Sequence, residues 1–471
     1  MNLGTLLKSL GTVCDNPETE ITSVTDNAEN VRKGSLFVAV KGQNCDGNKK
    51  IPLALSLGAA SVITDSDCTG ENIIKVSDAR KAYAFLCSAF YDNPQDKLKI
   101  IGITGTNGKT ATAVYLRHIL ESAGVRCAII GTLGSMSDGH FRETGYTTPE
   151  PSVLFEELSF FAEQGIECVI IEVSSQSLCQ HRVDPIEFTM GIFTNIGRDH
   201  LDYHKTPASY LEAKLRLASL SRKILVNKDS ILAGAFNEDR CIFFSAKDFY
   251  SDISAKNIRF YEDYLSYLIF DGRTLTRVRV NGTGNIILYN SLCAAAAALT
   301  YGISPGIISS ALSCLPQVEG RMQRVYDGDF SVYVDFAHTP DALFAVLAEL
   351  KRRCRNKLIC VFGCGGNRDK GKRSEMGHAA STFSDIIVIT DDNPRNESSE
   401  NIAEDIIKGI NNKNNIYREP DREKAIAYAL GKAQTGDIVV IAGKGHEKYQ
   451  ITCEGKKYFS DEIAVKKLLG V

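Results

Sequence analysis

The feature that most restricts the fold of this chain is the stretch 98–112, LKIIGITGTNGKTAT. A short apolar run ends in the turn 105–108, GTNG, and a helical pattern begins at Lys109. A strand, a glycine turn, Lys-Thr and a helix, in that order, are typical of a phosphate-binding loop, where backbone N–H groups and the helix N-terminus face a polyphosphate. We expect Lys109 to reach the outer phosphates of a nucleotide and the Thr110 hydroxyl to ligate Mg²⁺.

The spacing of this loop is a variant. The strict pattern G-x-x-x-x-G-K-[ST] would place glycine where Ile103 stands. An ordinary strand-to-helix turn is therefore the alternative interpretation. We favour the nucleotide-binding interpretation because Lys-Thr directly follows the glycine turn.

Length and composition set the wider limits. A chain of 471 residues, 44% of them hydrophobic, has room for about three domains. A net charge of −3 argues against a general nucleic-acid binder or a membrane-surface binder. We expect no signal peptide and no membrane insertion, and a cytoplasmic location. The 14 cysteines include no C-x-x-C pair, so we expect reduced thiols and no structural zinc.

The first domain is predicted over residues 1–97 as a small α/β unit. Strands are expected at 34–42 and 59–64, with a helical stretch between them and a glycine-bearing loop at 43–48. The polar, Pro-bearing segment 92–97 is expected to be a linker.

The second domain is predicted over residues 98–321 as a doubly wound α/β sheet, because near-continuous apolar runs alternate with helical patterns. Short strands are expected at 241–287 and an Ala-rich helix at 288–301. The other expected strands are 98–104, 125–132, 168–174, 188–194 and 224–227, and the other expected helices are 109–123, 151–164 and 207–219.

Ligands of such a sheet collect beyond the carboxyl ends of its strands. Polar residues follow the predicted strands at those points, among them Thr147, Thr148, Glu172 and His200. Glu172 and His200 are suitable Mg²⁺ ligands, directly or through water. Each alone could be a helix cap or a surface residue, but several at successive strand ends favour a site.

The third domain is predicted over residues 322–471 as a second, Rossmann-like sheet. Its strands are expected at 330–337, 357–363, 385–390 and 437–442, with helices between them. Three loops, GCGGNRDKGKR (363–373), DDNPRNE (391–397) and AGKGHEKYQ (442–450), each follow a strand and should converge on one edge of the sheet.

Together these motifs resemble the Mur ligase family, in the family's order and over essentially the whole chain. Within the family they resemble the UDP-N-acetylmuramoyl-tripeptide synthetases of the MurE class. DNPR resembles the signature of members that add meso-diaminopimelate rather than lysine. The motifs are GTNGKT (105–110), EVSS (172–175), RDHLDYH (198–204), EAK (212–214), VDFAHTPDAL (334–343), GCGGNRDKGKR (363–373), DNPR (392–395) and GKGHE (443–447).

The resemblance implies three α/β domains: an N-terminal UDP-binding domain, a central ATPase-type parallel sheet and a C-terminal Rossmann-like domain. It implies an ATP- and Mg²⁺-dependent ligase of peptidoglycan precursor synthesis. The substrates would be UDP-MurNAc-L-Ala-D-Glu and meso-2,6-diaminopimelate, joined through an acyl phosphate. We expect a monomer.

The resemblance also assigns residues. Lys109, Glu172, His200 and Lys214 would be catalytic; Thr110, Glu172, His200 and Lys214 would surround Mg²⁺, with Lys214 carbamylated. Without the resemblance, Lys214 would be taken for a solvated helix lysine. ATP would contact Gly105, Thr106, Asn107, Gly108, Lys109, Thr110, Ala111, Asn290, Arg321 and Asp335. The UDP substrate would contact Asn27, Gln43, Asn44, Cys45, Thr147, Thr148, Ser174, Gln180 and Arg182. Meso-diaminopimelate would contact Arg368, Asp392, Asn393, Pro394, Arg395, Gly443 and Glu447.

The sequence departs from the family pattern mainly at the uridine end. The usual D-S-R is Asp26-Asn27-Ala28 here, and the usual H-Q-A is the stretch 43–45, QNC. Ile287 replaces an asparagine before the Ala-rich helix. None of these departures touches the predicted phosphoryl-transfer centre.

Three alternatives remain at this point. The first is a Mur ligase that adds L-lysine or another diamino acid, and the second is a ligase similar to folylpolyglutamate synthase. The third is a nucleotide-binding module without turnover, which the intact set of catalytic residues disfavours.

Overall fold

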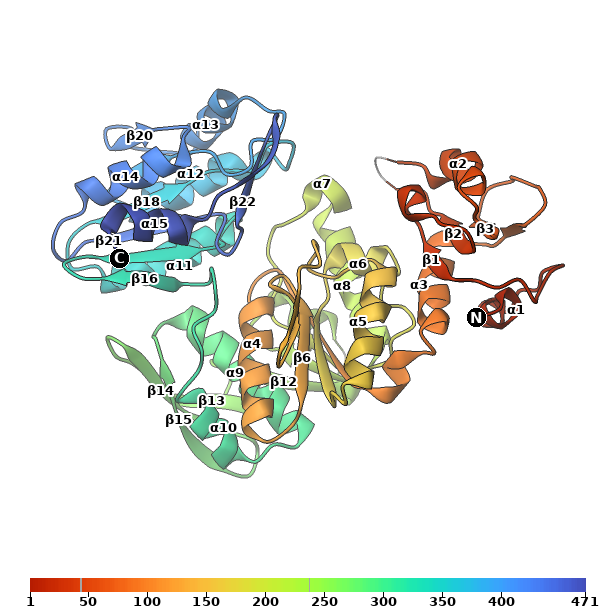
Figure 1. Ribbon diagram of the computed structural model, residues 1–471. Coiled ribbons are helices and arrows are strands. Elements are labelled where there is room, and N and C mark those ends of the chain that lie inside the picture. Colours follow the sequence, from red (N-terminus) through yellow and green to blue (C-terminus); the bar gives the residue numbers. More distant parts are fainter. Residues whose placement is uncertain (43–44, 237) are drawn as a thin grey trace.

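The computed structural model describes residues 1–42, 45–236 and 238–471, arranged as three lobes along the chain (Figure 1). Each lobe has its own β-sheet, so the predicted α/β class is confirmed. The sheets fall within the three predicted domains, whose bounds stay a prediction. Within the described residues, no helix combines the length and the apolar character needed to cross a membrane.

The first lobe is a four-stranded parallel sheet in the order β1-β2-β3-β4. The expected linker 92–97 is partly a 3₁₀ turn, Pro94–Lys97, and Pro94 is buried. The elements are α1 (Leu3–Lys8), β1 (Ser23–Thr25), β2 (Ser35–Ala39), α2 (Ile51–Ser56), β3 (Ser61–Thr64), β4 (Ile73–Lys75) and α3 (Ala79–Phe90).

The central lobe contains an eleven-stranded sheet in the order β15-β14-β13-β12-β11-β10-β5-β9-β6-β7-β8. The block from β13 to β6 is parallel, and both edges are antiparallel: β14-β15 on one side and β7-β8 on the other. The predicted parallel sheet is thus confirmed for the middle of the sheet only. Its strands are β5 (Lys99–Thr104), β6 (Cys127–Gly131), β7 (Gly134–Ser137), β8 (His140–Arg142), β9 (Cys168–Glu172), β10 (Phe188–Phe193), β11 (Ser221–Asn227), β12 (Cys241–Ser245), β13 (Ile253–Phe260), β14 (Tyr264–Phe270) and β15 (Leu275–Asn281).

Helices cover the central sheet and bury its apolar strands. The Ala-rich α9 packs against α4, and five consecutive alanines of α9, residues 294–298, are fully buried because small side chains allow close helix packing. The helices are α4 (Lys109–Ser122), α5 (Pro151–Glu163), α6 (Ser175–Cys179), α7 (Leu201–His204), α8 (Pro207–Ser219), α9 (Asn285–Tyr301) and α10 (Pro305–Leu312).

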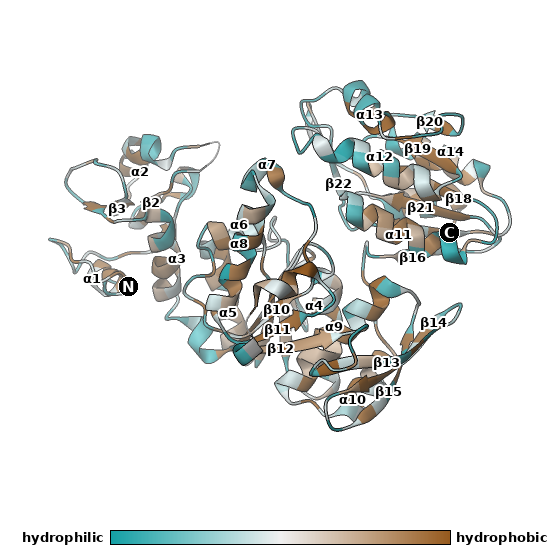
Figure 2. Cartoon of the chain, turned by 180° about the vertical axis from the view of Figure 1, so that it is seen from behind, coloured by the Kyte–Doolittle hydropathy of each residue, from teal (hydrophilic) through white to brown (hydrophobic). Residues whose placement is uncertain are grey.

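The third lobe has a six-stranded sheet in the order β16-β17-β21-β18-β19-β20, parallel except for β16, and a separate hairpin β22-β23. In Figure 2 the strands β18 and β21 are largely brown, as expected for strands buried on both faces. The elements are β16 (Gln323–Asp327), β17 (Ser331–Asp335), α11 (Pro340–Arg353), β18 (Leu358–Phe362), α12 (Gly371–Phe383), β19 (Ile386–Ile389), α13 (Ser399–Ile407), β20 (Ile416–Arg418), α14 (Arg422–Lys432), β21 (Ile438–Ala442), β22 (Tyr449–Thr452), β23 (Gly455–Tyr458) and α15 (Asp461–Leu469).

Sheet topology determines where polar loops meet. β5 lies between β9 and β10, so the glycine turn after β5 stands beside Glu172 at the end of β9 and Thr194 just past β10. In the third lobe β17, β21, β18 and β19 are parallel neighbours, and the three polar loops therefore leave the same edge, as predicted.

Candidate active site

The glycine turn is held tightly by its neighbours. Gly105 and Gly108 have φ angles of +149° and +86°. A Cβ on Gly105 would lie 1.9 Å from Thr194 Oγ1, and one on Gly108 would lie 2.5 Å from Asn290 Oδ1. Only glycine allows these close approaches. The Asn107 carbonyl accepts a hydrogen bond from Thr194 Oγ1 at 2.7 Å, which fixes the turn against β10.

The side chain of Lys109 folds back over the turn. Its Nζ donates to the carbonyls of Gly105 and Thr106 at 2.9 and 3.1 Å. Burial lowers its pKa, while the carboxylates of Glu172 and Asp199 oppose that shift. A buried ammonium at the N-terminus of α4 is suited to an anionic group of a ligand.

Glu172 links the turn to the next strand. One of its oxygens accepts from Thr110 Oγ1 at 2.8 Å and from Thr132 Oγ1 at 3.0 Å, and the other accepts from the Thr132 backbone N–H at 3.0 Å. Arg321, at the junction of the central and third lobes, donates to Thr110 Oγ1 at 3.3 Å. The predicted metal ligands Thr110 and Glu172 are therefore in direct contact.

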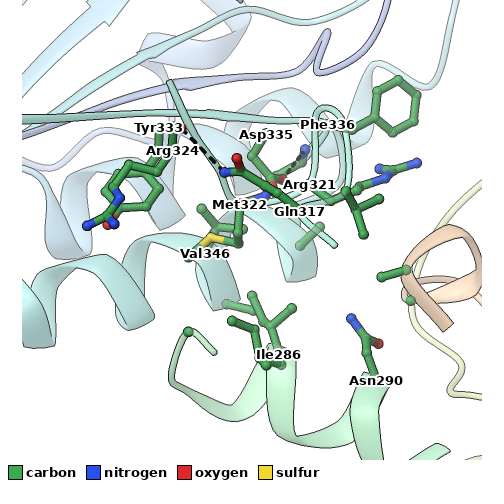
Figure 3. A pocket seen from close by; sticks show the side chains of 18 of the residues that line it. Ile286, Asn290, Gln317, Arg321, Met322, Arg324, Tyr333, Asp335, Phe336 and Val346 are labelled. Atoms are coloured by element: carbon green, nitrogen blue, oxygen red, sulfur yellow. Dashed lines mark hydrogen bonds between the residues drawn. The ribbon is translucent and has the colours of Figure 1, made fainter. Parts of the chain in front are cut away.

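A cavity of about 1130 Å³ opens beside the turn, between the central and third lobes (Figure 3). Its wall near the turn is polar, and its wall further away contains apolar side chains such as Ile286, Met322 and Val346. A nucleotide has the matching combination of a charged and a flat apolar end. Of the predicted ATP contacts the lining includes Thr106, Asn107, Gly108, Lys109, Thr110, Ala111, Asn290, Arg321 and Asp335.

Asp335 organises the entry to the third lobe. Its two oxygens accept from the backbone N–H groups of Met322 and Ala337 at 2.6 and 2.7 Å. Burial raises its pKa, and the charge of Arg321 opposes that shift. The Arg321 guanidinium lies 4.4 Å from the centre of the Phe336 ring.

Lys214 lies inside the protein rather than on a helix surface. Thr206 caps α8 by accepting from the Ser209 N–H, and the helix then directs Lys214 inward. Its Nζ donates to the Gly105 carbonyl at 2.8 Å and lies 4.6 Å from the centre of the Tyr210 ring. Burial, with help from the charge of Lys109, lowers the pKa of Lys214 well below its ordinary value. A neutral amine of this kind is nucleophilic and can react with carbon dioxide.

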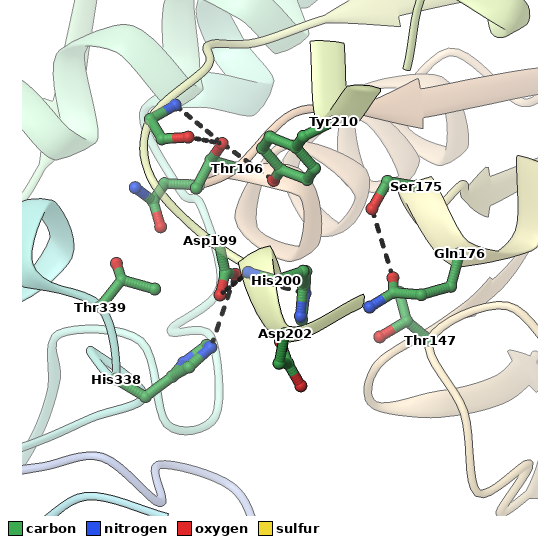
Figure 4. A network of polar contacts seen from close by, with 12 residues as sticks. Thr106, Thr147, Ser175, Gln176, Asp199, His200, Asp202, Tyr210, His338 and Thr339 are labelled. Atoms are coloured by element: carbon green, nitrogen blue, oxygen red, sulfur yellow. Dashed lines mark hydrogen bonds and ion pairs between the residues drawn. The ribbon is translucent and has the colours of Figure 1, made fainter. Parts of the chain in front are cut away.

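Two histidines from different lobes meet at one carboxylate (Figure 4). Asp199 Oδ2 lies 3.3 Å from His200 Nε2 and 3.8 Å from His338 Nε2. Burial lowers the pKa of His200 to about 4, so its imidazole is neutral at pH 7. Burial alone would raise the pKa of Asp199, but the two imidazoles and the Lys372 ammonium outweigh it and lower that pKa to about 2.

A second cavity of about 870 Å³ is lined by all three lobes. Both cavities include Lys109, Thr147, Asp199, His200 and His338 in their linings, so they meet at this point. Lys214 lines this second cavity. The predicted substrate contacts that line it are Asn27, Cys45, Thr147, Thr148, Ser174, Gln180, Arg182, Arg368, Asp392, Asn393, Arg395, Gly443 and Glu447.

At one end of the second cavity, Arg182 is fixed by neutral and acidic partners. It donates to the Thr148 carbonyl at 2.6 Å and to Gln180 Oε1 at 2.7 Å, and it forms an ion pair with Glu150. Tyr146 covers its guanidinium at 5.1 Å. The predicted residues Gln43 and Asn44 lie outside the described residues.

At the other end, the buried ammonium of Lys444 joins two of the third lobe's loops. It donates to Glu447 Oε2 at 2.8 Å and to Asn393 Oδ1 at 3.2 Å, and Asn393 Nδ2 donates to the same Glu447 oxygen at 3.0 Å. Arg395 has a φ of +55° and donates to the Gly366 carbonyl at 3.0 Å. Pro394, also predicted as a contact, is buried and is not part of the lining.

Several of these groups have no role predicted from the sequence. Asp199, His338 and Lys444 stand inside the motifs quoted above, but the predicted roles fall on neighbouring residues of those motifs. The sequence does contain an indication that Lys444 is buried, because a lysine between two glycines after a buried strand has little room to reach solvent. The contact between Asp199 and His338 had no local signal, since the two residues belong to different lobes.

The residues near the turn could hold a Mg²⁺ ion only through side chains of different chemical kinds. Among the described residues, no group of three or more His, Cys, Asp and Glu side chains is placed to hold a metal ion. A hydroxyl, a carboxylate and a neutral imidazole are available from Thr110, Glu172 and His200, and a carbamate on Lys214 would add a further anionic oxygen ligand.

Comparisons with known proteins agree with this architecture. The chain matches the Mur ligase middle domain over residues 103–298 and the Mur ligase glutamate ligase domain over residues 320–445. It is 39% identical to a UDP-N-acetylmuramoyl-L-alanyl-D-glutamate–2,6-diaminopimelate ligase of Aquifex aeolicus, over 96% of this chain and 94% of that one. It is 35% identical to a ligase of the same name from Clostridium tetani, over 100% and 99% of the two chains.

Solved structures give the same result. A structure titled UDP-N-acetylmuramoyl-L-alanyl-D-glutamate–2,6-diaminopimelate ligase superposes with a TM-score of 0.70 at 30% identity, over 100% of this chain and 99% of that chain. The folylpolyglutamate synthase of Mycobacterium tuberculosis, complexed with ADP and AMPPCP, superposes with a TM-score of 0.64 at 16% identity over 82% of this chain and 94% of that chain, which shows a shared fold alone.

Proposed function

The chain belongs to the Mur ligase family, and from this premise we propose that it joins meso-2,6-diaminopimelate to UDP-N-acetylmuramoyl-L-alanyl-D-glutamate at the expense of ATP. The reaction would form an amide between the side-chain carboxyl of the D-Glu residue and one amino group of the diamino acid. We place this reaction in the cytoplasm and expect a monomeric enzyme.

One observation carries the proposal: the two cavities meet at Lys109, Asp199, His200 and His338. The first cavity fits a nucleotide with its phosphates at the glycine turn. The second has room for a long anionic substrate at one end and a charged amino acid at the other. The meeting point is where a terminal phosphate and a carboxylate would come together.

The chemistry requires the carboxylate to be activated first. A carboxylate oxygen attacks the γ-phosphorus, the bond to the β,γ-bridging oxygen breaks, and ADP leaves with that electron pair. The amine then attacks the acyl carbon, a proton leaves the nitrogen, and inorganic phosphate departs. Two anions must approach each other in the first step, and the buried ammonium of Lys109 would offset their repulsion.

We propose that Thr110, Glu172, His200 and a carbamylated Lys214 hold Mg²⁺. The bound ion would neutralise charge on the phosphates. The low pKa of Lys214 supports the modification, because the amine must be neutral to attack carbon dioxide. Its burial supports the modification as well, since an unmodified ammonium in this place would repel the cation.

At the amino-acid end, we propose that Arg395 binds the distal carboxylate of meso-diaminopimelate and that Glu447 or Asp392 accepts its distal amine. Arg368, Asn393 and Gly443 would complete this pocket. Lysine has no distal carboxylate and would leave a guanidinium unpaired, which is an effective means of rejection. At the opposite end, Asn27, Cys45, Thr147, Thr148, Ser174, Gln180 and Arg182 would hold the UDP substrate.

The test is an ATP-dependent phosphate-release assay with the UDP-dipeptide substrate and one of three amino acids. We expect release with meso-diaminopimelate and little with L-lysine or L-glutamate. Turnover with lysine alone would exclude the amino-acid assignment, and turnover of a folate substrate with glutamate would favour a folylpolyglutamate synthase. ATP binding without substrate-dependent ADP formation would favour a nucleotide-binding module.

A further inference from the structure

The segment 368–373 carries four cations, and one of them differs from the rest. Arg368 pairs with Asp202 at 3.7 Å, Lys370 pairs with Glu397 at 3.2 Å, and Arg373 pairs with Glu397 at 2.7 Å. Lys372 has no carboxylate partner among the described ion pairs. It is half-buried, and it lines the second cavity.

Lys372 lies beside the meeting point of the two cavities. Its Nζ donates to the backbone carbonyl of His338 at 2.9 Å, and His338 lines both cavities. Its charge also acts on Asp199, which lines both cavities from the central lobe. The ammonium therefore approaches the meeting point of the two cavities from the third-lobe side, next to His338.

The groups around this point are mostly negative, and a cation would balance their charge. Glu172 and Asp199 are acidic, and a carbamate on Lys214 would be a further anion. Both the γ-phosphate and the substrate carboxylate are negative. On the central-lobe side, Lys109 is the cation that is predicted to contact the phosphates. An unpaired ammonium from the third lobe would balance charge on the far side of the transferred group.

We propose that Lys372 is a further catalytic residue, which donates a hydrogen bond to a non-bridging oxygen of the phosphoryl group while that group passes from ATP to the carboxylate. In this step the carboxylate oxygen forms a bond to the γ-phosphorus as the bond to the bridging oxygen of ADP breaks. Lys372 takes no proton. The inference rests on the proposed function and adds a residue to it.

The test compares Lys372→Met with Lys372→Arg, and with Lys370→Met as the matched control, because Lys370 is an exposed lysine of the same segment. We expect Lys372→Met to lower kcat by about 100-fold, with the KM for meso-diaminopimelate nearly unchanged. Lys372→Arg should recover part of the rate, and Lys370→Met should behave as the wild-type protein.

Titration calorimetry separates a catalytic role from a structural one. The probes are ADP alone and ADP with aluminium fluoride, which imitates the phosphoryl group in transit, each with the UDP-dipeptide present. Lys372→Met should bind ADP normally and the aluminium fluoride complex about 100-fold more weakly. Equal weakening of both probes, together with a lower Tm, would mean that Lys372 only supports the His338 loop, and it would overturn the proposal.

A wild-type kcat in Lys372→Met would overturn the proposal as well. Failure of the proposed function is recognised separately: the wild-type protein would then release no phosphate in response to meso-diaminopimelate. The calorimetric comparison does not require turnover and tests Lys372 in either case.

Discussion

Lys214 Nζ donates a hydrogen bond to the Gly105 carbonyl at 2.8 Å, which ties helix α8 to the first residue of the glycine turn. A positive charge on Lys214 is unfavourable in the unmodified protein, because the side chain is fully buried and close to Lys109. Conversion to a carbamate would remove this positive charge and supply an anionic oxygen.

We therefore expect Lys214→Ala to lower kcat by about 100-fold or more, because it deletes an anionic group at the phosphoryl-transfer centre. A small carboxylate added to the buffer should restore part of the rate by occupying the vacated space. Intact-mass measurement should show one added carbon dioxide on the wild-type protein and none on the variant. Lys81→Ala, on the exposed side of α3, is the control. Wild-type activity in Lys214→Ala would refute the carbamate role.

Asp199 provides the second prediction, since it contacts His200 and His338 together. Asp199→Asn should keep the shape of the side chain but remove the charge that orients the His200 imidazole. The Mg²⁺ concentration that gives half-maximal activity should rise about tenfold, as is typical when the partner of a metal ligand is changed. A Mg²⁺ titration of phosphate release measures this, with the exposed Asp67→Asn as the control. An unchanged Mg²⁺ requirement would show that Asp199 does not act through a metal ligand.

Much of the fold was predictable because its signals are local. The apolar run predicted as a strand at 98–104 is β5, Lys99–Thr104, and the helix predicted at 207–219 is α8, Pro207–Ser219. Buried parallel strands have continuous apolar sequences, and Pro at the start of a helix marks its boundary. Helix α3 was missed although Asp78 caps it and its apolar residues recur at helical spacing.

The antiparallel edges and the contacts between lobes were less predictable. The short strands β7 and β8 pair with each other through only three residues, so their sequence has little periodicity. The meeting of Asp199 with His338 depends on how two separately folded sheets are placed. No local pattern contains that information, and the family motifs indicated only which loops would be near each other.

The third prediction concerns Arg395, whose guanidinium is held by the Gly366 and Asn393 carbonyls at 3.0 and 3.2 Å. Arg395→Ala should raise the KM for meso-diaminopimelate by about 30-fold, because a charged partner of the distal carboxylate is lost. The KM for ATP should change little, since Arg395 is not part of the first cavity's lining. Steady-state kinetics with each substrate varied in turn measures the difference.

The exposed Arg418→Ala, on β20 of the same sheet, controls for a general loss of positive charge. An unchanged KM for meso-diaminopimelate in Arg395→Ala would contradict the assignment of the distal carboxylate to this residue.

The fourth prediction concerns the support of the amino-acid pocket by Glu397. Its carboxylate accepts two hydrogen bonds from the fully buried Arg373 at 2.8 and 2.7 Å and one from the Asn367 N–H at 3.0 Å. Removing the charge would leave Arg373 with Asp405 as its remaining acidic partner. Glu397→Gln should therefore lower the free energy of unfolding by about 3 kcal/mol. Urea denaturation at pH 7 measures this, with the exposed Glu404→Gln on α13 as the control.

The same pair predicts a pH dependence. The hydrogen bonds from Arg373 lower the pKa of Glu397 from its ordinary value of 4.5 to about 2. A lowered pKa stabilises the folded protein above the unfolded value and loses that contribution as the pH falls through the folded value. The difference in unfolding free energy between the wild-type protein and Glu397→Gln should therefore be constant above about pH 5 and shrink as the pH falls from 4.5 towards 2. Urea titrations at several pH values measure it, and a difference that stays constant down to pH 2 would contradict the assignment of this charge pair.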